Sequence, residues 1–198
     1  MADSEYAADD TLIARVAAGD REAFAALYRR RRPDVFRFAL LMSGSTSVAD
    51  DVAQDVFMEL IHHAGRYDAN RSTVVPWLLG IARNHVLRSR HRQRSVVTME
   101  DAHSAPQLAV ASDPLAGIAR RQYIAALRRA LLALPVKYRE TIVLCDLHEM
   151  TYADAAASLG CAIGTVRSRL HRGRAMLAAR LADTSAAPMR SPLARWML

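Results

Sequence analysis

The sequence has few cysteines and glycines and almost no lysine, and these shortages exclude several classes of protein. Cys145 and Cys161 are the only cysteines among 198 residues, too few for a disulfide framework or a cysteine-rich zinc site. Eight glycines and 6% aromatic residues, beside many Ala, Leu and Arg, favour helices over sheets. No run approaches the ~18 apolar residues of a membrane-spanning helix, and no secretory signal is recognisable. We therefore expect a cytoplasmic protein without direct membrane insertion.

Arginine supplies nearly all of the positive charge, since Lys137 is the only lysine and the formal net charge is +7. This charge is unevenly distributed. Residues 20–94 carry a net +5 and residues 114–182 a net +7, whereas residues 95–113 contain no basic residue and carry −3. Two basic blocks around a short acidic stretch predict two domains joined by a flexible linker. The alternative is one domain with a long surface loop, although loops of this length are uncommon in compact domains.

The spacing of apolar residues predicts helices along the whole chain, so the expected fold class is all-α: two small helical domains, the second containing a helix-turn-helix. Glycines and prolines mark the expected boundaries. The predicted helices run from about residue 10 to Gly19, from Asp20 to Pro33, from Val35 to Ser43, over 47–63, from the polar turn at 68–73 to about Arg92, from Pro114 to Leu134, and over 137–148, and they are followed by the two helices of the helix-turn-helix.

The helix-turn-helix is the most specific local signal. Thr151 and Asp154 resemble a capping box, and Gly160 suits the left-handed residue of the turn. Ile163 and Val166 are expected to anchor the second helix.

The second helix of this motif has two different faces. Its predicted apolar stripe faces the first helix and comprises Val166, Leu170, Gly173 and Leu177. The side chains outside the stripe suit base edges and phosphates of a DNA major groove, and they are Arg167, Ser168, His171, Arg172 and Arg174. An αα-hairpin whose arginines are merely solvated is the alternative.

Two helices of the first block also carry distinctive faces. On the helix over 47–63, polar and acidic residues lie opposite the apolar side, which by itself is also the pattern of a solvated face. On the helix after the polar turn, one arc of about 80° suits contact with unstacked bases and the backbone, and it holds Trp77, Ile81, Asn84, Arg88 and His91. Trp77 alone would more often be a core residue.

Three separated motifs occur in one order: ADDVAQDVFMEL, then RYDANRSTVVPWLLGIARNHVLRSRHR, then ALPVKYRETIVLCDLHEMTYADAAASLGCAIGTVRSRLHRGRAML. Together they resemble the bacterial sigma factors of the extracytoplasmic-function (ECF) group over residues 15–182. The resemblance implies a non-enzymatic subunit that recruits core RNA polymerase to promoters and assists DNA opening. It also implies a region 2-like domain over 10–94, a linker over 95–113, a region 4-like domain over 114–182 and a tail over 183–198.

The resemblance further implies three contact surfaces. The surface that docks on core polymerase, at the coiled coil of the β′ subunit with the β subunit as a further partner, is Asp50, Asp51, Gln54 and Asp55. The surface for the −10 element, including a loop that captures a flipped base, is Tyr67, Asn70, Arg71, Ser72, Thr73, Trp77, Asn84 and Arg88. The surface for the −35 element is Arg167, Ser168, His171, Arg172 and Arg174. An anti-sigma factor is a further implied partner, and no cofactor or metal is expected.

Two other functions compete with this one. A free-standing helix-turn-helix regulator would keep the DNA contacts and make the acidic face structural. An enzyme would need a site such as a metal held by histidines, for which the candidates are His62, His63, His85 and His91. Their spacing matches no dedicated zinc motif, and the sequence has no P-loop, nucleophile elbow or dinucleotide loop.

Overall fold

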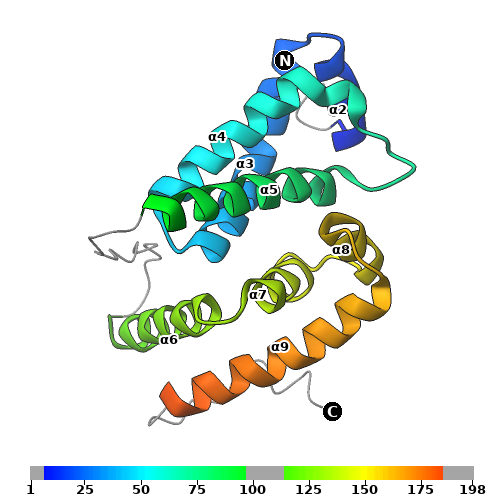
Figure 1. Ribbon diagram of the computed structural model, residues 1–198. Coiled ribbons are helices and arrows are strands. Elements are labelled where there is room, and N and C mark those ends of the chain that lie inside the picture. The colour runs from blue at the N-terminus through cyan, green and yellow to red at the C-terminus, as the bar shows by residue number, and fades with distance from the viewer. Residues whose placement is uncertain (1–6, 97–113, 185–198) are drawn as a thin grey trace.

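The computed structural model describes residues 7–96 and 114–184, and no residue in these two ranges lies in a β-strand. The expected all-α class is therefore confirmed. Helices from the N-terminal half form one layer and helices from the C-terminal half form a second layer beneath it (Figure 1). In the described part of the chain no helix combines the length and apolarity needed to cross a bilayer. Most of the expected linker and tail lie outside these residues.

The N-terminal half consists of α2 (Asp9–Ala17), α3 (Arg21–Ser43), α4 (Thr46–His63), the short 3-10 helix η1 (Ala64–Arg66) and α5 (Val74–Val96). Asp20 starts α3 by accepting hydrogen bonds from the amides of Glu22 and Ala23, at 2.9 and 3.0 Å. The Ala23 amide in particular lowers the pKa of the Asp20 carboxyl. Fully buried side chains from all four α-helices fill the core, among them Leu12, Leu27, Phe38, Phe57, Leu60 and Leu78.

Pro33 does not end a helix, and on this point the sequence-based expectation is wrong. α3 continues through Pro33 for ten further residues to Ser43. Proline removes only the hydrogen bond to the carbonyl of Arg29, and both residues are exposed, so water can solvate that carbonyl. The cost of about 3 kcal/mol is offset because the continued helix buries Val35 and Phe38, at about 1.5–3 kcal/mol for each large apolar side chain.

The C-terminal half consists of α6 (Pro114–Leu132), α7 (Val136–Ile142), the π-helical turn η2 (Val143–Leu147), α8 (Tyr152–Leu159) and α9 (Ile163–Thr184). The helix expected over 137–148 thus changes its hydrogen-bonding pattern after Ile142. The amide of His148 donates to the carbonyl of Val143 at 3.0 Å, five residues back. Residues 148–151 then connect this wider turn to α8, the first helix of the predicted motif.

The helix-turn-helix itself is confirmed in its main features. The hydroxyl of Thr151 caps α8 by accepting from the amide of Asp154 at 3.1 Å, and it donates to the Asp154 carboxylate at 2.7 Å. Gly160 ends α8 in the left-handed conformation, with φ 62°. Of the predicted anchors, Val166 is fully buried but Ile163 is 44% exposed. As the first residue of α9, Ile163 has no preceding turn to cover it, so the anchoring contact falls to Val166.

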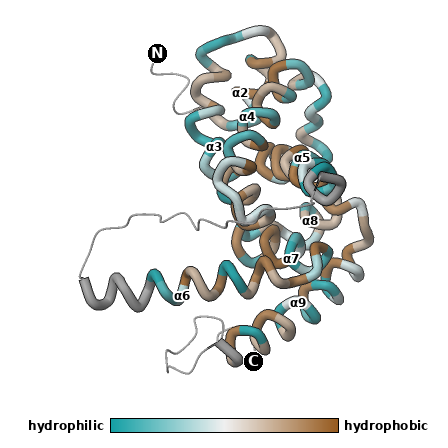
Figure 2. The backbone as a smooth tube through the Cα atoms, turned by 60° about the vertical axis from the view of Figure 1, so that its left-hand side comes forward, coloured by the Kyte–Doolittle hydropathy of each residue, from teal (hydrophilic) through white to brown (hydrophobic). Residues whose placement is uncertain are grey.

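The apolar stripe of α9 is buried, but it faces more than the first helix of the motif. Leu170 and Leu177 are nearly inaccessible. A Cβ at Gly173 would lie 3.0 Å from Ile142 and 3.3 Å from Tyr138, both on α7. The stripe therefore packs on α7 as well as on α8, and Gly173 permits the close approach of α7 and α9 (Figure 2 shows hydrophobic segments where these helices meet).

A buried arginine joins the two halves. Arg139 is 4% exposed, and its guanidinium donates to the carbonyls of Leu131 at 3.1 Å, Leu134 at 3.0 Å and also Leu132. A further bond, 2.7 Å long, reaches the carbonyl of Met42 near the end of α3. Burial, and secondarily the charge of Arg90, lowers the pKa of Arg139 to about 10, so it remains a cation at neutral pH. Its charge is suited to the C-terminal ends of two helices, where carbonyls lack partners.

A half-buried histidine lies near the same contact, and it makes the stability of the fold depend on pH. The ring centroid of His148 lies 6.0 Å from that of Phe38 on α3, and its Nε2 is buried without a hydrogen-bond partner among the described residues. Burial, together with the nearby Arg37, lowers the pKa of His148 from 6.5 to about 4. The native state therefore binds fewer protons than the unfolded state between these two values, and stability falls as the pH falls.

We expect the free energy of unfolding to decrease by about 1 kcal/mol between pH 7.5 and 5.5 on account of His148 alone. The measurement is urea denaturation at both pH values for the wild type and for His148→Gln, which cannot bind the proton. The wild type should lose more stability than the variant over this interval. Equal losses in the two proteins would contradict the role of His148.

Candidate functional site

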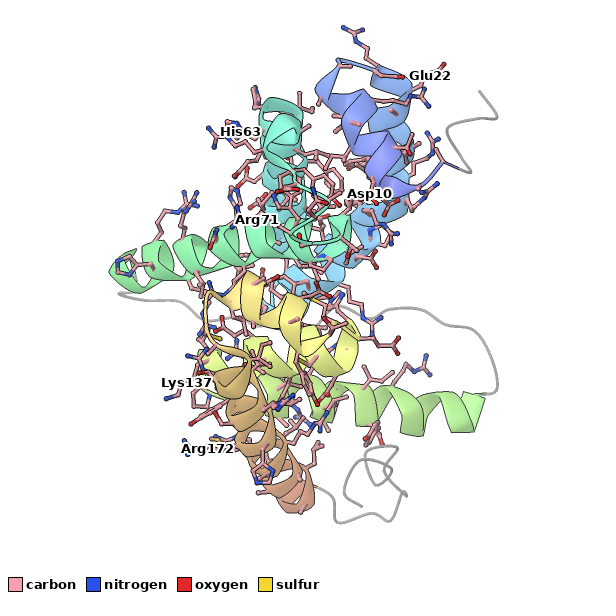
Figure 3. All side chains as sticks on the ribbon, turned by 90° about the vertical axis from the view of Figure 1, so that its right-hand side faces the viewer. Asp10, Glu22, His63, Arg71, Lys137 and Arg172 are labelled. Atoms are coloured by element: carbon pink, nitrogen blue, oxygen red, sulfur yellow. The ribbon has the colours of Figure 1, made fainter. Side chains whose placement is uncertain are left out.

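The predicted DNA-reading face of α9 is open to solvent. Arg167, Ser168, His171 and Arg172 are all exposed, whereas the stripe opposite them is buried. Arg172 lies on the lower half of the molecule, well away from Arg71 (Figure 3). These four side chains are therefore available to base edges and phosphates on one continuous face of a helix.

Arg167 has an aromatic neighbour. Its guanidinium carbon lies 5.9 Å from the ring centroid of Tyr152, the first residue of α8, which is within the range of a cation–π contact. Ser168 donates from its hydroxyl to the carbonyl of Thr165 at 3.0 Å, one turn back. The first helix of the motif thus supports the first predicted base-reading side chain of the second.

Arg174 differs from the other four predicted residues. Its guanidinium forms two hydrogen bonds with the carboxylate of Asp146 on η2, at 2.5 and 3.0 Å. The Asp146 side chain is 15% exposed, and this bond raises the pKa of Arg174 above its ordinary value. Arg174 therefore links α9 to the π-helical turn, in a position directed toward its own domain.

The loop before α5 is held in shape by bonds at both of its ends. The hydroxyl of Tyr67 is hydrogen-bonded to the carboxylate of Asp10 on α2 and donates to the carbonyl of Ser72 at 3.0 Å. Burial and the bond to Asp10 raise the pKa of Tyr67. The carboxylate of Asp68 accepts from the amide and the side chain of Asn70, at 2.9 and 3.1 Å. Sequence reasoning missed Asp10, which lies 57 residues before Tyr67.

The outer face of α5 continues from this loop. The Trp77 indole is half-buried and packs edge-on against the ring of Tyr67, with 5.5 Å between centroids. Asn84 and Arg88 are exposed further along the helix, and Arg71 projects from the loop (Figure 3). Trp77 therefore has features of both roles that the sequence left open: it packs against the loop, and part of its surface remains exposed. The opposite face of α5, with Leu78, is buried.

The polar face of α4 is exposed, and it is less uniformly acidic than expected. Asp51 and Gln54 are open to solvent, whereas Asp50 pairs with Arg32 at 2.7 Å and Asp55 lies 3.3 Å from Nδ1 of His85. This face ends in two exposed apolar side chains that sequence reasoning missed, Met58 at 50% and Ile61 at 47% exposure. The spacing of 54, 58 and 61 already placed them on the face of Gln54. The surface defined by Asp51, Gln54, Asp55, Met58 and Ile61 is called the α4 surface below.

The histidines considered for a metal site lie in separate surroundings. His62 bonds through Nδ1 to the carbonyl of Met58 at 2.7 Å, and His85 lies between two carboxylates of α4, with Nε2 2.9 Å from Glu59. Within residues 7–96 and 114–184, no three side chains of His, Cys, Asp or Glu converge as a metal site would require.

The burial of Cys145 raises the pKa of its thiol to about 11, which keeps it protonated at neutral pH.

Comparison with known proteins assigns both halves of the chain. Residues 27–96 match the family described as Sigma-70 region 2, and residues 124–177 match Sigma-70, region 4. The ECF RNA polymerase sigma factor SigM of Mycobacterium tuberculosis is 38% identical over 175 residues, which are 86% of this chain and 83% of that protein. SigW of Bacillus subtilis, also an ECF sigma factor, is 28% identical over 86% of this chain and 95% of its own length.

Solved structures agree with the sequence comparisons. CnrH, solved in complex with the cytosolic domain of CnrY, superposes with a TM-score of 0.69 at 28% identity, covering 90% of this chain and 100% of CnrH. The sigma factor RpoE of Bartonella quintana, solved with the anti-sigma factor NepR, gives 0.60 at 29% identity, covering 76% and 91%. Regions 2 and 4 together define a sigma-70-type initiation factor. Within that class, the chain belongs to the ECF RNA polymerase sigma factors.

The contrast between two arginines of α9 is directly testable. We expect Arg174→Gln to lower the free energy of unfolding by about 1–2 kcal/mol, because it breaks a bidentate, partly buried pair with Asp146. Arg172→Gln should change stability by less than about 0.5 kcal/mol, since Arg172 is exposed. The two variants make the same Arg→Gln change on the same helix, and urea denaturation compares their free energies of unfolding. A stable Arg174→Gln variant would show that the pair with Asp146 contributes little.

Proposed function

We propose that this sigma factor directs core RNA polymerase to specific promoters through three separate surfaces. The α4 surface binds polymerase, the Tyr67–Thr73 loop with the outer face of α5 binds the −10 element, and the exposed face of α9 binds the −35 element. The observation that carries this proposal is the occurrence of regions 2 and 4 in one chain, with most of the predicted contact residues of each region on its surface.

Recognition of the −35 element follows from the chemistry of α9. An arginine can bond both O6 and N7 of a guanine in the major groove, which discriminates against other bases by about 1–3 kcal/mol. Arg167 is the best placed for this role because its guanidinium lies near the Tyr152 ring, which favours a defined position. Ser168, His171 and Arg172 supply further contacts to bases and phosphates. Arg174 is assigned to the support of the helix, through Asp146.

Recognition of the −10 element requires a base to leave the stack, which costs a few kcal/mol. A loop that is already ordered loses little conformational entropy on binding and can offset that cost more fully. Tyr67 and Asp68 provide this order through their bonds within the loop and to α2. The flipped base would contact Asn70, Arg71, Ser72 and Thr73, while Asn84 and Arg88 on α5 hold the same strand.

Docking on core polymerase uses both polar and apolar contacts. The exposed side chains of Asp51 and Gln54 suit a partner that carries basic groups, such as the β′ coiled coil, and Asp50 adds to this charge beside Arg32. Met58 and Ile61 provide exposed apolar area, and its removal from water on docking favours association. The charged part would govern orientation and the rate of association.

Other assignments follow from the same proposal. We expect an anti-sigma factor to regulate the chain, since the similar RpoE of Bartonella quintana was solved in complex with the anti-sigma factor NepR. We expect no catalytic activity of its own, and action in the cytoplasm, where polymerase and promoter DNA meet. A free-standing helix-turn-helix regulator is not favoured, because such a protein has no need of region 2.

The decisive test is transcription by purified core polymerase of the encoding organism, with and without this protein, on fragments of that organism's genome. Holoenzyme should initiate at a small set of promoters that core polymerase alone does not use. Sequencing the transcript ends identifies the −10 and −35 elements. If no fragment is stimulated, the protein is not a sigma factor for that polymerase.

Asp51→Ala and Ile61→Ala should each weaken binding to core polymerase about tenfold, because each removes an exposed contact without disturbing the core. Glu22→Ala is the matched control, since Glu22 is also exposed but lies at the first turn of α3, at the upper end of the molecule (Figure 3). Binding is measured by fluorescence anisotropy of the labelled sigma factor. If the wild type and the three variants bind core polymerase with equal affinity, the α4 surface is not the docking surface.

A further inference from the structure

Helix α2 lies before region 2, since the region 2 match starts at residue 27, yet it packs into the same core. Its apolar side is buried there through Leu12, Ile13 and Val16. Its first turn carries two neighbouring carboxylates, Asp9 and Asp10, and each of them contacts a different part of region 2. The pair therefore joins α2 both to α3 and to the loop before α5.

Asp9 fixes the N-terminal end of α2 on α3. Its side chain is 13% exposed, and its carboxylate accepts from Arg30 at 2.7 Å and from Arg31 at 2.5 Å. Arg30 also donates to the carbonyl of Ala7, at 2.8 Å. Charge-assisted bonds of this kind are among the stronger hydrogen bonds in proteins. Asp10, the next residue, is therefore presented to the loop from a fixed position.

Asp10 reaches the loop through the hydroxyl of Tyr67. The same hydroxyl contacts the carbonyl of Ser72 at 3.0 Å, so α2 and the end of the loop meet at one atom. A phenol shares a single proton between two such acceptors, and the charged carboxylate is the stronger of them. Because the carbonyl of Ser72 and the amide of Thr73 form one planar unit, the hydroxyl also orients the peptide that leads into α5. The shape of the loop thus depends on a carboxylate 57 residues before Tyr67.

The charge of Asp10 is unfavourable for the surface beside it. Asp10 is exposed, and the DNA strand that the loop is proposed to bind is a polyanion. A carboxylate in this position repels phosphates, so electrostatics alone would favour a neutral residue. The bond to Tyr67 accounts for a carboxylate at this place.

We propose that Asp10 is a positioning residue for the −10 element, because through Tyr67 it holds the loop in the shape that receives the flipped base. Asp10 itself does not contact DNA, and its charge slightly opposes the binding of phosphates. Helix α2 is then a part of the −10 recognition surface although it lies outside region 2. The role in base capture rests on the proposed function of the loop, whereas the support that Asp10 gives to the shape of the loop does not.

Two substitutions separate the charge of Asp10 from its hydrogen bond. Asp10→Asn removes the charge but keeps an oxygen that accepts from the hydroxyl, whereas Asp10→Ala removes both. If charge alone mattered, both variants would bind the −10 element more tightly and to the same degree. We expect instead that Asp10→Ala and Tyr67→Phe each lose about fivefold in preference for the flipped base, with Asp10→Asn in between. Adding Asp10→Ala to Tyr67→Phe should cause no further loss, because the bond is already absent.

The first measurement is hydrogen exchange of the full chain without DNA. Exchange of the amides over residues 68–73 should be about fivefold faster in Asp10→Ala and Tyr67→Phe, because a loop that has lost this bond opens more often. Glu22→Ala removes an exposed carboxylate from the first turn of another helix and should exchange like the wild type. Circular dichroism checks folding, and if Asp10→Ala is not folded, Tyr67→Phe decides. Equal exchange in the wild type, Asp10→Ala and Tyr67→Phe would overturn the support of the loop by Asp10.

The second measurement is the binding of holoenzyme to labelled single strands of the −10 element, whose sequence comes from the mapped transcripts. Each position is replaced in turn by an abasic nucleotide, and the captured base is the one whose loss weakens wild-type binding most. The ratio of the two affinities is the base preference. It should fall about fivefold in Asp10→Ala and Tyr67→Phe and stay unchanged in Glu22→Ala. Affinity for the abasic strand should not fall in any variant.

The outcomes distinguish this inference from the proposed function. A base preference that is the same in the wild type, Asp10→Ala and Tyr67→Phe would overturn the positioning role. Equally tighter binding of Asp10→Ala and Asp10→Asn to the intact and the abasic strand would also overturn it, since the charge alone would then explain the result. If the wild-type holoenzyme shows no base preference at any position, the proposed function of the loop is wrong. The exchange measurement still decides in that case whether Asp10 supports the loop.

Discussion

The arrangement of this molecule depends on the hydrogen bonds that the buried guanidinium of Arg139 donates to backbone carbonyls. A buried cation without a carboxylate partner is expensive unless every donor finds an acceptor. Here the acceptors are backbone carbonyls at the ends of α6 and α3, which would otherwise lack partners themselves. One side chain thus satisfies two helix termini and fixes where α7 begins relative to them. Because the π-helical turn and the helix-turn-helix come after α7 in the chain, the start of α7 also helps to set their positions.

Most of the fold could be predicted from the sequence, because apolar periodicity and capping residues act locally. Asp20, Gly160 and the stripe of α9 lie where pattern reasoning placed them. Pro33 was misread, since its cost is local whereas the burial that offsets it involves residues of other helices. Ile163 was misread for a similar reason: periodicity assigns a face to a residue but does not reveal where the covering helix ends.

The candidate site was harder to predict than the fold, since its residues act through distant partners. Arg167 and Arg174 look equivalent in sequence, yet one faces solvent and the other pairs with Asp146. Nothing in the spacing of α2 and the loop indicates that Asp10 bonds to Tyr67. Met58 and Ile61 have the apolar character of core residues, and only their spacing from Gln54 indicates the exposed face on which the structure places them. Motif order, in contrast, identified the family, because it samples many positions at once.

In the loop before α5, the residues that hold its shape differ from those that the proposed function assigns to contact with a base. Tyr67 and Asp68 make its internal bonds. The side chains of Arg71 and Thr73 are exposed and are not needed for these bonds. Substitutions at the outward positions can therefore accumulate without unfolding the domain. In a genome that carries several such factors, this division lets a duplicated copy acquire a new set of target genes while it continues to use the same polymerase. On the proposed function, the fold of the loop is kept while its base preference changes.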